Sequence, residues 1–144
     1  MATPDLVQAF YERIWNTGDL AAVPELLAPD FAFRGSLGVE LNGQTQFVEY
    51  VRSIRAALSE YHCEIVECVT EGNRAFARME FSGRHVGILR GRQPTGELVH
   101  WQGAALFRFD GRSIATLWVL GDLAGLDAVL QANHERVTAR WRSN

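Results

Sequence analysis

The sequence has few cysteines, and this limits the kinds of site that it can form. Cys63 and Cys68 are the two cysteines of the chain. On a single strand, an odd spacing places two side chains on opposite faces, so the thiols cannot easily form a disulfide. We therefore predict two buried thiols, with neither a disulfide nor a metal site.

Long apolar runs and an excess of positive charge are also missing. No stretch approaches the roughly 20 apolar residues of a membrane-spanning helix, and the first ten residues, MATPDLVQAF, lack the basic and apolar regions of a signal peptide. Basic residues number 14 against 17 acidic ones, for a net charge of -3, and they form no stripe that could follow a phosphate backbone. We expect a soluble, cytoplasmic protein with no membrane and no nucleic-acid partner.

Several motifs of cofactor chemistry are missing as well. The chain has no glycine-rich phosphate loop, no serine-centred nucleophile elbow and no pair of histidines at metal spacing. The segment GDLAGL, residues 121–126, contains two glycines without the fingerprint for dinucleotides. We therefore expect no cofactor and no metal.

The residues that are present predict one domain, residues 1–144, since no repeat or linker divides the chain. Helical spacing of apolar residues predicts a helix from Asp5 to Gly18, a short helix or two turns from Asp19 to Leu27, and a helix from Thr45 with a buried face. A short strand, Phe31 to Arg34, is predicted between them. The buried face of the third helix consists of Phe47, Val51, Ile54 and Leu58.

The pattern changes to strands after about residue 61. Runs rich in β-branched and aromatic residues, separated by turn residues, predict four strands, and a final helix follows from about Leu126. This order predicts an α+β fold, with three helices packed on a curved, mainly antiparallel sheet that encloses a pocket. The predicted strands are His62–Thr70, Arg74–His85, Leu98–Phe109 and Ser113–Gly121.

Three segments resemble the SnoaL-like polyketide cyclases: FYERIWNTGDLAAVPELLAPDF (10–31), RHVGILRGRQPTGELV (84–99) and FRFDGRSIATLWVLGDLAGL (107–126). The resemblance implies the cone-shaped α+β barrel that this family shares with ketosteroid isomerase, scytalone dehydratase and nuclear transport factor 2. It also implies a small apolar or polycyclic ligand and a homodimer formed through the sheet. Because this fold supports many functions, it does not by itself fix the chemistry.

Asp122 is the central candidate. In the resembling cyclases an aspartate at this strand end is the acid/base of an intramolecular aldol condensation without metal or organic cofactor, and Asp122 matches that position. A carboxylate in an apolar pocket exchanges protons more readily near neutral pH. The alternative is that Asp122 caps a helical turn formed by residues 123–125.

The neighbours of Asp122 depend on the register of the last hairpin. Strand alternation places Ile114, Thr116, Trp118 and Leu120 on the face of Asp122. A type I turn with Gly111 as a bulge would put His100, Gln102, Ala104 and Leu106 beside it, and a type I′ turn would put Val99, Trp101, Gly103 and Phe107 there. We predict the first register, with His100 as a catalytic group and Gln102 as a substrate contact. The alternative is an exposed strand face with ordinary polar residues.

His85 is the third catalytic candidate. The odd positions of its strand are mostly apolar, so His85 is predicted to face inward, and HVG at 85–87 resembles a context common in the family. There it could polarise a carbonyl oxygen or share a proton with Asp122. The alternative is a structural histidine.

Four aromatic residues and one arginine are predicted substrate contacts. Tyr11, Trp15, Phe33 and Trp118 offer flat surfaces for a polycyclic ligand, although aromatic residues at such spacings also build cores. At the position of Arg34, many members of the resembling family have a histidine. Inside the pocket it would favour an anionic substrate, and outside it would be a solvated strand residue.

These observations support three hypotheses. The first is a cofactor-independent cyclase or isomerase acting on an apolar carbonyl compound, with Asp122 as general acid/base. The second is a non-catalytic protein of the same fold that binds a small molecule. The third is a dimeric interaction module that uses the open face of the sheet.

Overall fold

The computed structural model describes residues 3–143, which begin with a helix in two parts, α1 (Asp5–Ala9) and the π-helical segment η1 (Phe10–Asn16). At its end the Thr17 N–H donates to the Glu12 carbonyl over 3.1 Å, five residues back, which is the π-helical pattern. Gly18 follows with φ +74°, a conformation that ends the helix and that glycine adopts easily. The first predicted helix is confirmed.

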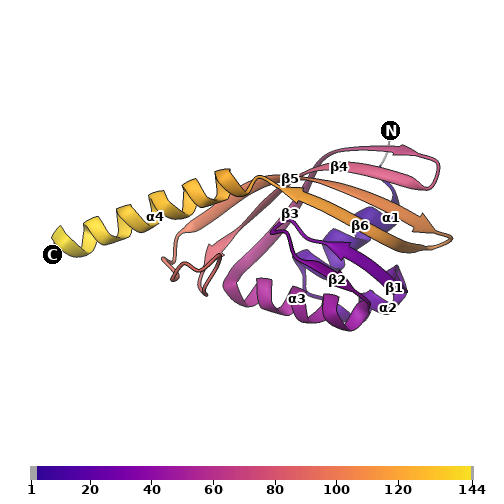
Figure 1. Cartoon of the computed structure of the whole chain (residues 1–144), viewed down its shortest axis with the longest axis horizontal. Helices are drawn as coiled ribbons and strands as arrows, with labels where there is room; N and C mark the ends of the chain where they lie inside the picture. The colour runs from indigo at the N-terminus through magenta and orange to yellow at the C-terminus, as the bar shows by residue number, and fades with distance from the viewer. Residues whose placement is uncertain (1–2, 144) are drawn as a thin grey trace.

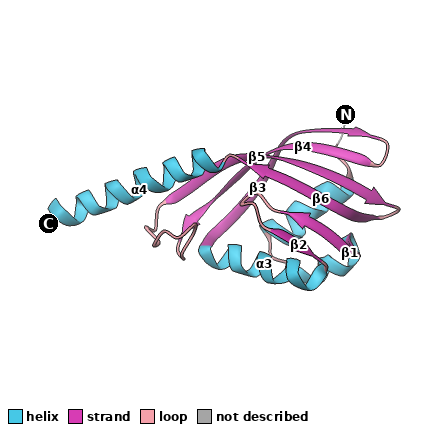
Figure 2. Ribbon diagram, in the orientation of Figure 1, coloured by secondary structure: helices cyan, strands magenta, loops and turns pink. Residues whose placement is uncertain are grey.

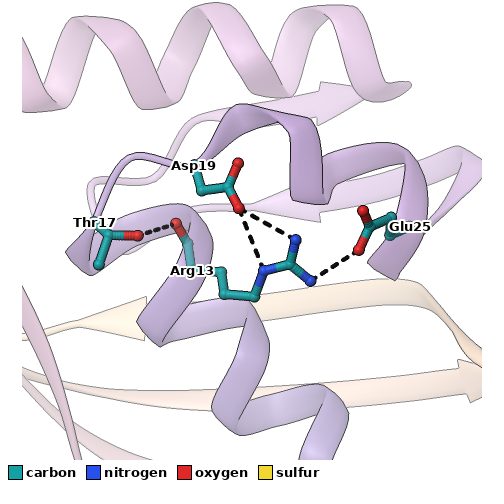
Figure 3. Close-up of polar contacts among 4 residues, drawn as sticks. All are labelled: Arg13, Thr17, Asp19 and Glu25. Carbon is teal, nitrogen blue, oxygen red and sulfur yellow. Dashed lines mark hydrogen bonds and ion pairs between the residues drawn. The ribbon is translucent and has the colours of Figure 1, made fainter.

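Arg13 ties this helix to the next two turns, η2 (Leu20–Ala22) and α2 (Val23–Leu26), as Figure 3 shows. Its guanidinium donates to Asp19 over 3.2 and 3.3 Å and to Glu25 over 2.8 Å. The Thr17 hydroxyl donates to the Arg13 carbonyl over 2.7 Å. Because these side chains are partly exposed, each ion pair adds little to the stability of the fold. Together they fix the orientation of the helix that carries Tyr11.

The sheet has six strands in the order β2-β1-β6-β5-β4-β3. The strands β3 to β6 form the predicted antiparallel meander, β1 runs parallel to β6, and β2 is an added edge strand. Helix α3 (Gln44–Ala57) and the N-terminal helices lie on one side of the sheet, which confirms the α+β prediction (Figures 1 and 2). The strands are β1 (Leu27–Arg34), β2 (Glu40–Asn42), β3 (Leu58–Glu71), β4 (Arg74–His85), β5 (Leu98–Asp110) and β6 (Ser113–Gly121).

The final helix, α4 (Leu123–Ser143), extends away from the body of the molecule (Figure 1). Polar contacts hold its packed side to residues 86–98. Arg90 contacts Asp127 at 2.6 Å, and Asn133 donates to the Leu98 carbonyl over 2.9 Å. Arg92 with Gln131 and Arg140 with Glu97 form two further contacts, both at 2.7 Å. No helix within residues 3–143 is long and apolar enough to span a membrane.

Bulges in the strands change which face the following residues take. Val66 is an extra residue in β3, so Cys63 pairs with Phe81 and Cys68 with Ala77, both on the inner face. The prediction that the thiols point to opposite faces is therefore wrong, because strict alternation fails at the bulge. Both cysteines are free thiols in the described chain; Cys63 is buried, as predicted, whereas Cys68 is only partly buried.

The core between helices and sheet is aromatic. The Phe47 ring of α3 lies 4.9 to 5.9 Å, centroid to centroid, from rings of the first helix and of β1. Such edge and offset contacts add to the free energy gained by burying the rings. As a result, the base of the cone is filled by side chains. Its fully buried phenylalanines are Phe10, Phe31, Phe47 and Phe107.

Candidate functional site

A cavity lies between the first helix, α3 and the inner face of the sheet. Its volume is about 20 Å³, room for about one water molecule. We call it the aromatic cavity because most of its walls are aromatic rings. The lining residues are Phe10, Tyr11, Trp15, Phe33, Ser36, Leu37, Tyr50, Ile54, Tyr61, Cys63, Phe81, Trp101, Leu117 and Val119.

Two polar groups of the cavity wall have no hydrogen-bond partner within residues 3–143. They are the Tyr11 hydroxyl, from η1, and the Trp101 Nε1–H, from β5, and both side chains are at least 95% buried. We call them the donor pair. Burial raises the pKa of Tyr11 well above its ordinary value, with Cys63 and Cys68 adding to the shift, so the hydroxyl stays protonated. A buried donor without an acceptor destabilises a protein by about 1 to 3 kcal/mol.

Cys63 forms another part of the cavity wall. Its backbone N–H donates to the Asn16 side-chain oxygen over 2.7 Å, and its carbonyl accepts from the Asn16 amide over 3.0 Å. Burial raises the pKa of the Cys63 thiol to about 12, although the Tyr61 hydroxyl and Arg55 oppose the shift. A protonated thiol is a poor nucleophile, so Cys63 shapes the cavity without offering a reactive thiolate.

Asp122 lies outside the aromatic cavity, at the start of α4. Its exposed carboxylate accepts the Gly125 N–H over 2.9 Å, and its carbonyl accepts the Leu126 N–H over 3.0 Å. This is the helix-capping alternative that the sequence left open. The catalytic role of Asp122 stays a prediction.

The register predicted for the last hairpin is observed, since Leu106 pairs with Trp118 and the Asp122 N–H donates to the Gln102 carbonyl over 2.8 Å. The turn that produces this register differs from the predicted one. It is a two-residue loop, and the register follows from a bulge at Ala115 in β6. The bulge buries Ile114 and leaves Trp118 exposed, so the prediction that they share a face is wrong.

The structure therefore brings His100 and Gln102 beside Asp122, but on the outer face of the sheet, where all three are exposed. They do not line the aromatic cavity, because the alternate residues of β5 point inward. His100 and Gln102 instead line a surface groove with His62, Glu64 and Glu80. Within residues 3–143, no three His, Cys, Asp or Glu side chains are placed to hold a metal ion.

His85 does face inward, but it lies beneath the 86–97 loop and is not one of the cavity residues. It is 1% exposed, and neither ring nitrogen has a hydrogen-bond partner in the described part of the chain. Burial lowers the pKa of His85, while the nearby backbone of Arg92 and Gly87 opposes that shift. The geometry favours a structural role at the base of the loop.

The stability of the protein is expected to fall as the pH drops below about 6.5, the ordinary pKa of histidine. The folded state holds His85 neutral while the unfolded chain protonates it, so the stabilisation is complete above that pH and declines below it. Urea unfolding between pH 7.5 and 5.5 measures the effect, in a window above the ordinary pKa values of carboxylates.

The variant His85→Leu should flatten this pH dependence, and His134→Gln, at an exposed histidine of α4, should leave it unchanged. An unaltered slope in His85→Leu would assign the pH dependence to other groups.

The predicted aromatic contacts divide into two groups. Tyr11, Trp15 and Phe33 line the aromatic cavity, whereas Trp118 is 45% exposed on the outer face. Arg34 lies with Trp118, its guanidinium carbon 5.5 Å from a ring centroid, and donates to the Val119 carbonyl. Arg34 is thus held outside the cavity by a cation–π contact.

Sequence reasoning missed Tyr50, Tyr61 and Trp101 as cavity residues. Trp101 belongs to the register set that we did not choose, and its apolar neighbours on the same face, Val99 and Phe107, were the signal that this face points inward.

The family model of the SnoaL-like polyketide cyclases matches residues 5–130, so the chain belongs to this family. It is similar to the aklanonic acid methyl ester cyclase DnrD of Streptomyces peucetius, with 33% identity over 112 residues that cover 75% of this chain and 77% of that protein.

Solved structures share the fold. A SnoaL-like polyketide cyclase from Agrobacterium tumefaciens superimposes with a TM-score of 0.75 at 16% identity, covering 89% of this chain and 98% of that one. A hypothetical protein with a ketosteroid isomerase-like fold from Catenulispora acidiphila, in complex with trimethylamine, gives 0.77 at 19% identity, covering 90% and 95%. Together with the family match, these structures establish the cone fold.

Proposed function

We propose that this protein is a cofactor-independent cyclase that acts on an apolar carbonyl compound held in the aromatic cavity. The donor pair carries this proposal. Trp Nε1–H can only donate, so the group that would satisfy it is an acceptor, and a carbonyl oxygen of a ligand can accept from this N–H or from the Tyr11 hydroxyl. Aromatic walls and a few convergent polar groups are typical of sites for flat organic ligands.

The donor pair would also stabilise the charge that develops in an aldol reaction. Removal of a proton next to the bound carbonyl turns its oxygen into an enolate oxygen, which binds more tightly to neutral donors in a dry site. The enolate carbon then forms a bond to a second carbonyl carbon of the same ligand, whose oxygen becomes an alkoxide and takes up a proton. Ring closure therefore needs one group that accepts a proton and returns it.

Asp122 is the group that we assign to this proton transfer. The support is its match to the family's aspartate and its place beside the cavity wall: its N–H bonds to Gln102, the residue after Trp101. The preceding residue, Gly121, packs against Ser36, which lines the cavity. In this proposal the ligand reaches from the donor pair to the rim, where Asp122 acts.

Turnover of a panel of polycyclic β-keto esters tests the proposal. NMR spectra follow the conversion of each ester to a cyclised product of the same mass. We expect catalysis without added metal or cofactor, and a rate that falls when either member of the donor pair is removed. Binding of the same esters without any conversion would overturn the proposal.

A second candidate is a protein that binds a small molecule without catalysis. The small cavity volume and the exposed carboxylate of Asp122 favour it. It predicts that Asp122→Asn leaves ligand affinity unchanged and that no ester is converted.

We also propose a homodimer formed through the outer face of the sheet. One row of apolar side chains crosses four strands there: Val69 pairs with Phe76, Phe76 with Leu106 and Leu106 with Trp118. These side chains are 39 to 54% exposed, and contiguous apolar surface of this kind marks interaction sites. A two-fold axis would set the row against its own copy.

Leu106→Glu is expected to convert this dimer to a monomer, because it places a charge in the middle of the row. Sedimentation velocity measures the change. The matched control is Ile88→Glu, at an apolar residue of the 86–97 loop that is 62% exposed. The dimer proposal fails if the wild type sediments as a monomer, or if both variants stay dimeric.

A further inference from the structure

The mouth of the aromatic cavity can be located from the exposure of its walls. Among the described lining residues, three are partly exposed, and the others are buried. Ser36 and Leu37 belong to the connection between β1 and β2, and Tyr50 belongs to α3. The cavity therefore meets the solvent between this connection, residues 35–39, and α3.

The connection is a compact loop, which we call the gate loop. The Gly35 N–H donates to the Val39 carbonyl and the Gly38 N–H to the Gly35 carbonyl, both over 2.9 Å. Gly38 has φ +93°, which favours glycine. Its own hydrogen bonds make the gate loop a compact unit.

Two glycines let the gate loop sit tightly over the mouth. A methyl group on Gly121 would lie 2.3 Å from the Ser36 carbonyl oxygen, so the backbones of β6 and the gate loop are in direct contact. A methyl group on Gly35 would lie 2.9 Å from the Tyr50 hydroxyl oxygen. The gate loop thus packs against Gly121 on one side and against Tyr50 on the other.

We propose that the gate loop admits ligands to the aromatic cavity, with Leu37 as the side chain that determines which ligand widths are accepted. This inference rests on the proposed function of the cavity as the ligand site. A cavity for about one water must widen to hold an organic ring. The buried walls belong to the packed core, whereas the gate loop is partly exposed. The gate loop is therefore the part of the wall that moves to admit a ligand.

Opening at this point would also connect the cavity to Asp122. Gly121, against which the gate loop packs, directly precedes Asp122, and Ser36 lies between Gly121 and the cavity. When Ser36 leaves Gly121, a ligand inside the cavity gains a path to the rim where Asp122 lies.

Stopped-flow quenching of tryptophan fluorescence tests the proposal, because Trp15 and Trp101 line the cavity. The probes are 1,8-dihydroxyanthraquinone, with three fused rings, and phenol, with one. For Leu37→Ala we expect the association rate constant of the anthraquinone to rise about tenfold, since entry no longer waits for a bulky side chain to move. The constant for phenol should change much less.

Gly121→Ala is an independent second variant, because the added methyl group pushes Ser36 away from residue 121 and leaves Leu37 intact. We expect it also to speed entry of the anthraquinone. The matched control is Val39→Ala, which shortens an exposed apolar side chain of the same loop that does not line the cavity.

Equal association rates in all four proteins would overturn the gate, and so would an equal effect of Val39→Ala and Leu37→Ala. Because the readout is binding, a gate effect without ester turnover would reject only the cyclase proposal. Turnover without a gate effect would reject only the gate.

Discussion

Tyr11→Phe is expected to make the protein more stable and much less active. In the free protein the Tyr11 hydroxyl is buried without an acceptor among residues 3–143, so its removal relieves an unfavourable contact and leaves the ring in place. We expect the free energy of unfolding to rise by about 1 kcal/mol. The same change removes one donor to the enolate oxygen, so turnover should fall by about a hundredfold.

Tyr61→Phe is the matched control, because Tyr61 lines the same cavity and its hydroxyl hydrogen-bonds with Cys63. Loss of a hydroxyl that has a partner should lower the free energy of unfolding, the opposite sign. Urea unfolding and ester turnover of both variants provide the comparison. If Tyr11→Phe lowers stability and keeps full turnover, the Tyr11 hydroxyl is satisfied within the protein and has no role toward a ligand.

Asp122→Asn is the second change with a large expected effect. Asparagine caps a helix about as well as aspartate, so the hydrogen bond from the Gly125 N–H and the stability should be kept. Its amide cannot take up a proton, so turnover should fall by about a hundredfold or more. Asp122→Ala should lose the cap as well, with about 1 kcal/mol of stability.

The pair of variants separates the two roles of Asp122. A pure cap predicts that Asp122→Asn keeps turnover and that Asp122→Ala loses stability alone. A proton-transfer group predicts that both lose turnover. Turnover and urea unfolding of the same preparations decide between these outcomes.

Much of the fold could be predicted from periodicity. The bounds of β4 and β6 and the end of the first helix at Gly18 match the prediction, because strand alternation, turn glycines and helix spacing act locally. The edge strand β2 and the first half of β1 were missed. β2 has only three residues, and the first half of β1 contains Pro29, so neither segment shows enough alternation to predict a strand.

The candidate site was harder to predict because it depends on details that alternation does not include. The bulges at Val66 and Ala115 each exchange the two faces of a strand, and no local sequence signal marks them. The register that joins Asp122 to His100 and Gln102 was right, yet it fixes only which residues share a face. Which face of the sheet is the inner one depends on which face the helices cover. That Tyr11 and Trp101 have donors without partners on this face can be seen only in the packed structure.

The most direct test of the account is the indole N–H signal of Trp101 in a proton–nitrogen NMR spectrum during titration with 1,8-dihydroxyanthraquinone. The chain has four tryptophans, and Trp101→Phe assigns the signal. If the donor pair binds the carbonyl oxygen, the Trp101 signal moves downfield as a hydrogen bond forms, and Tyr11→Phe weakens the binding. If the ligand binds while the Trp101 signal stays in place, the donor pair does not hold it, and the proposed function is contradicted.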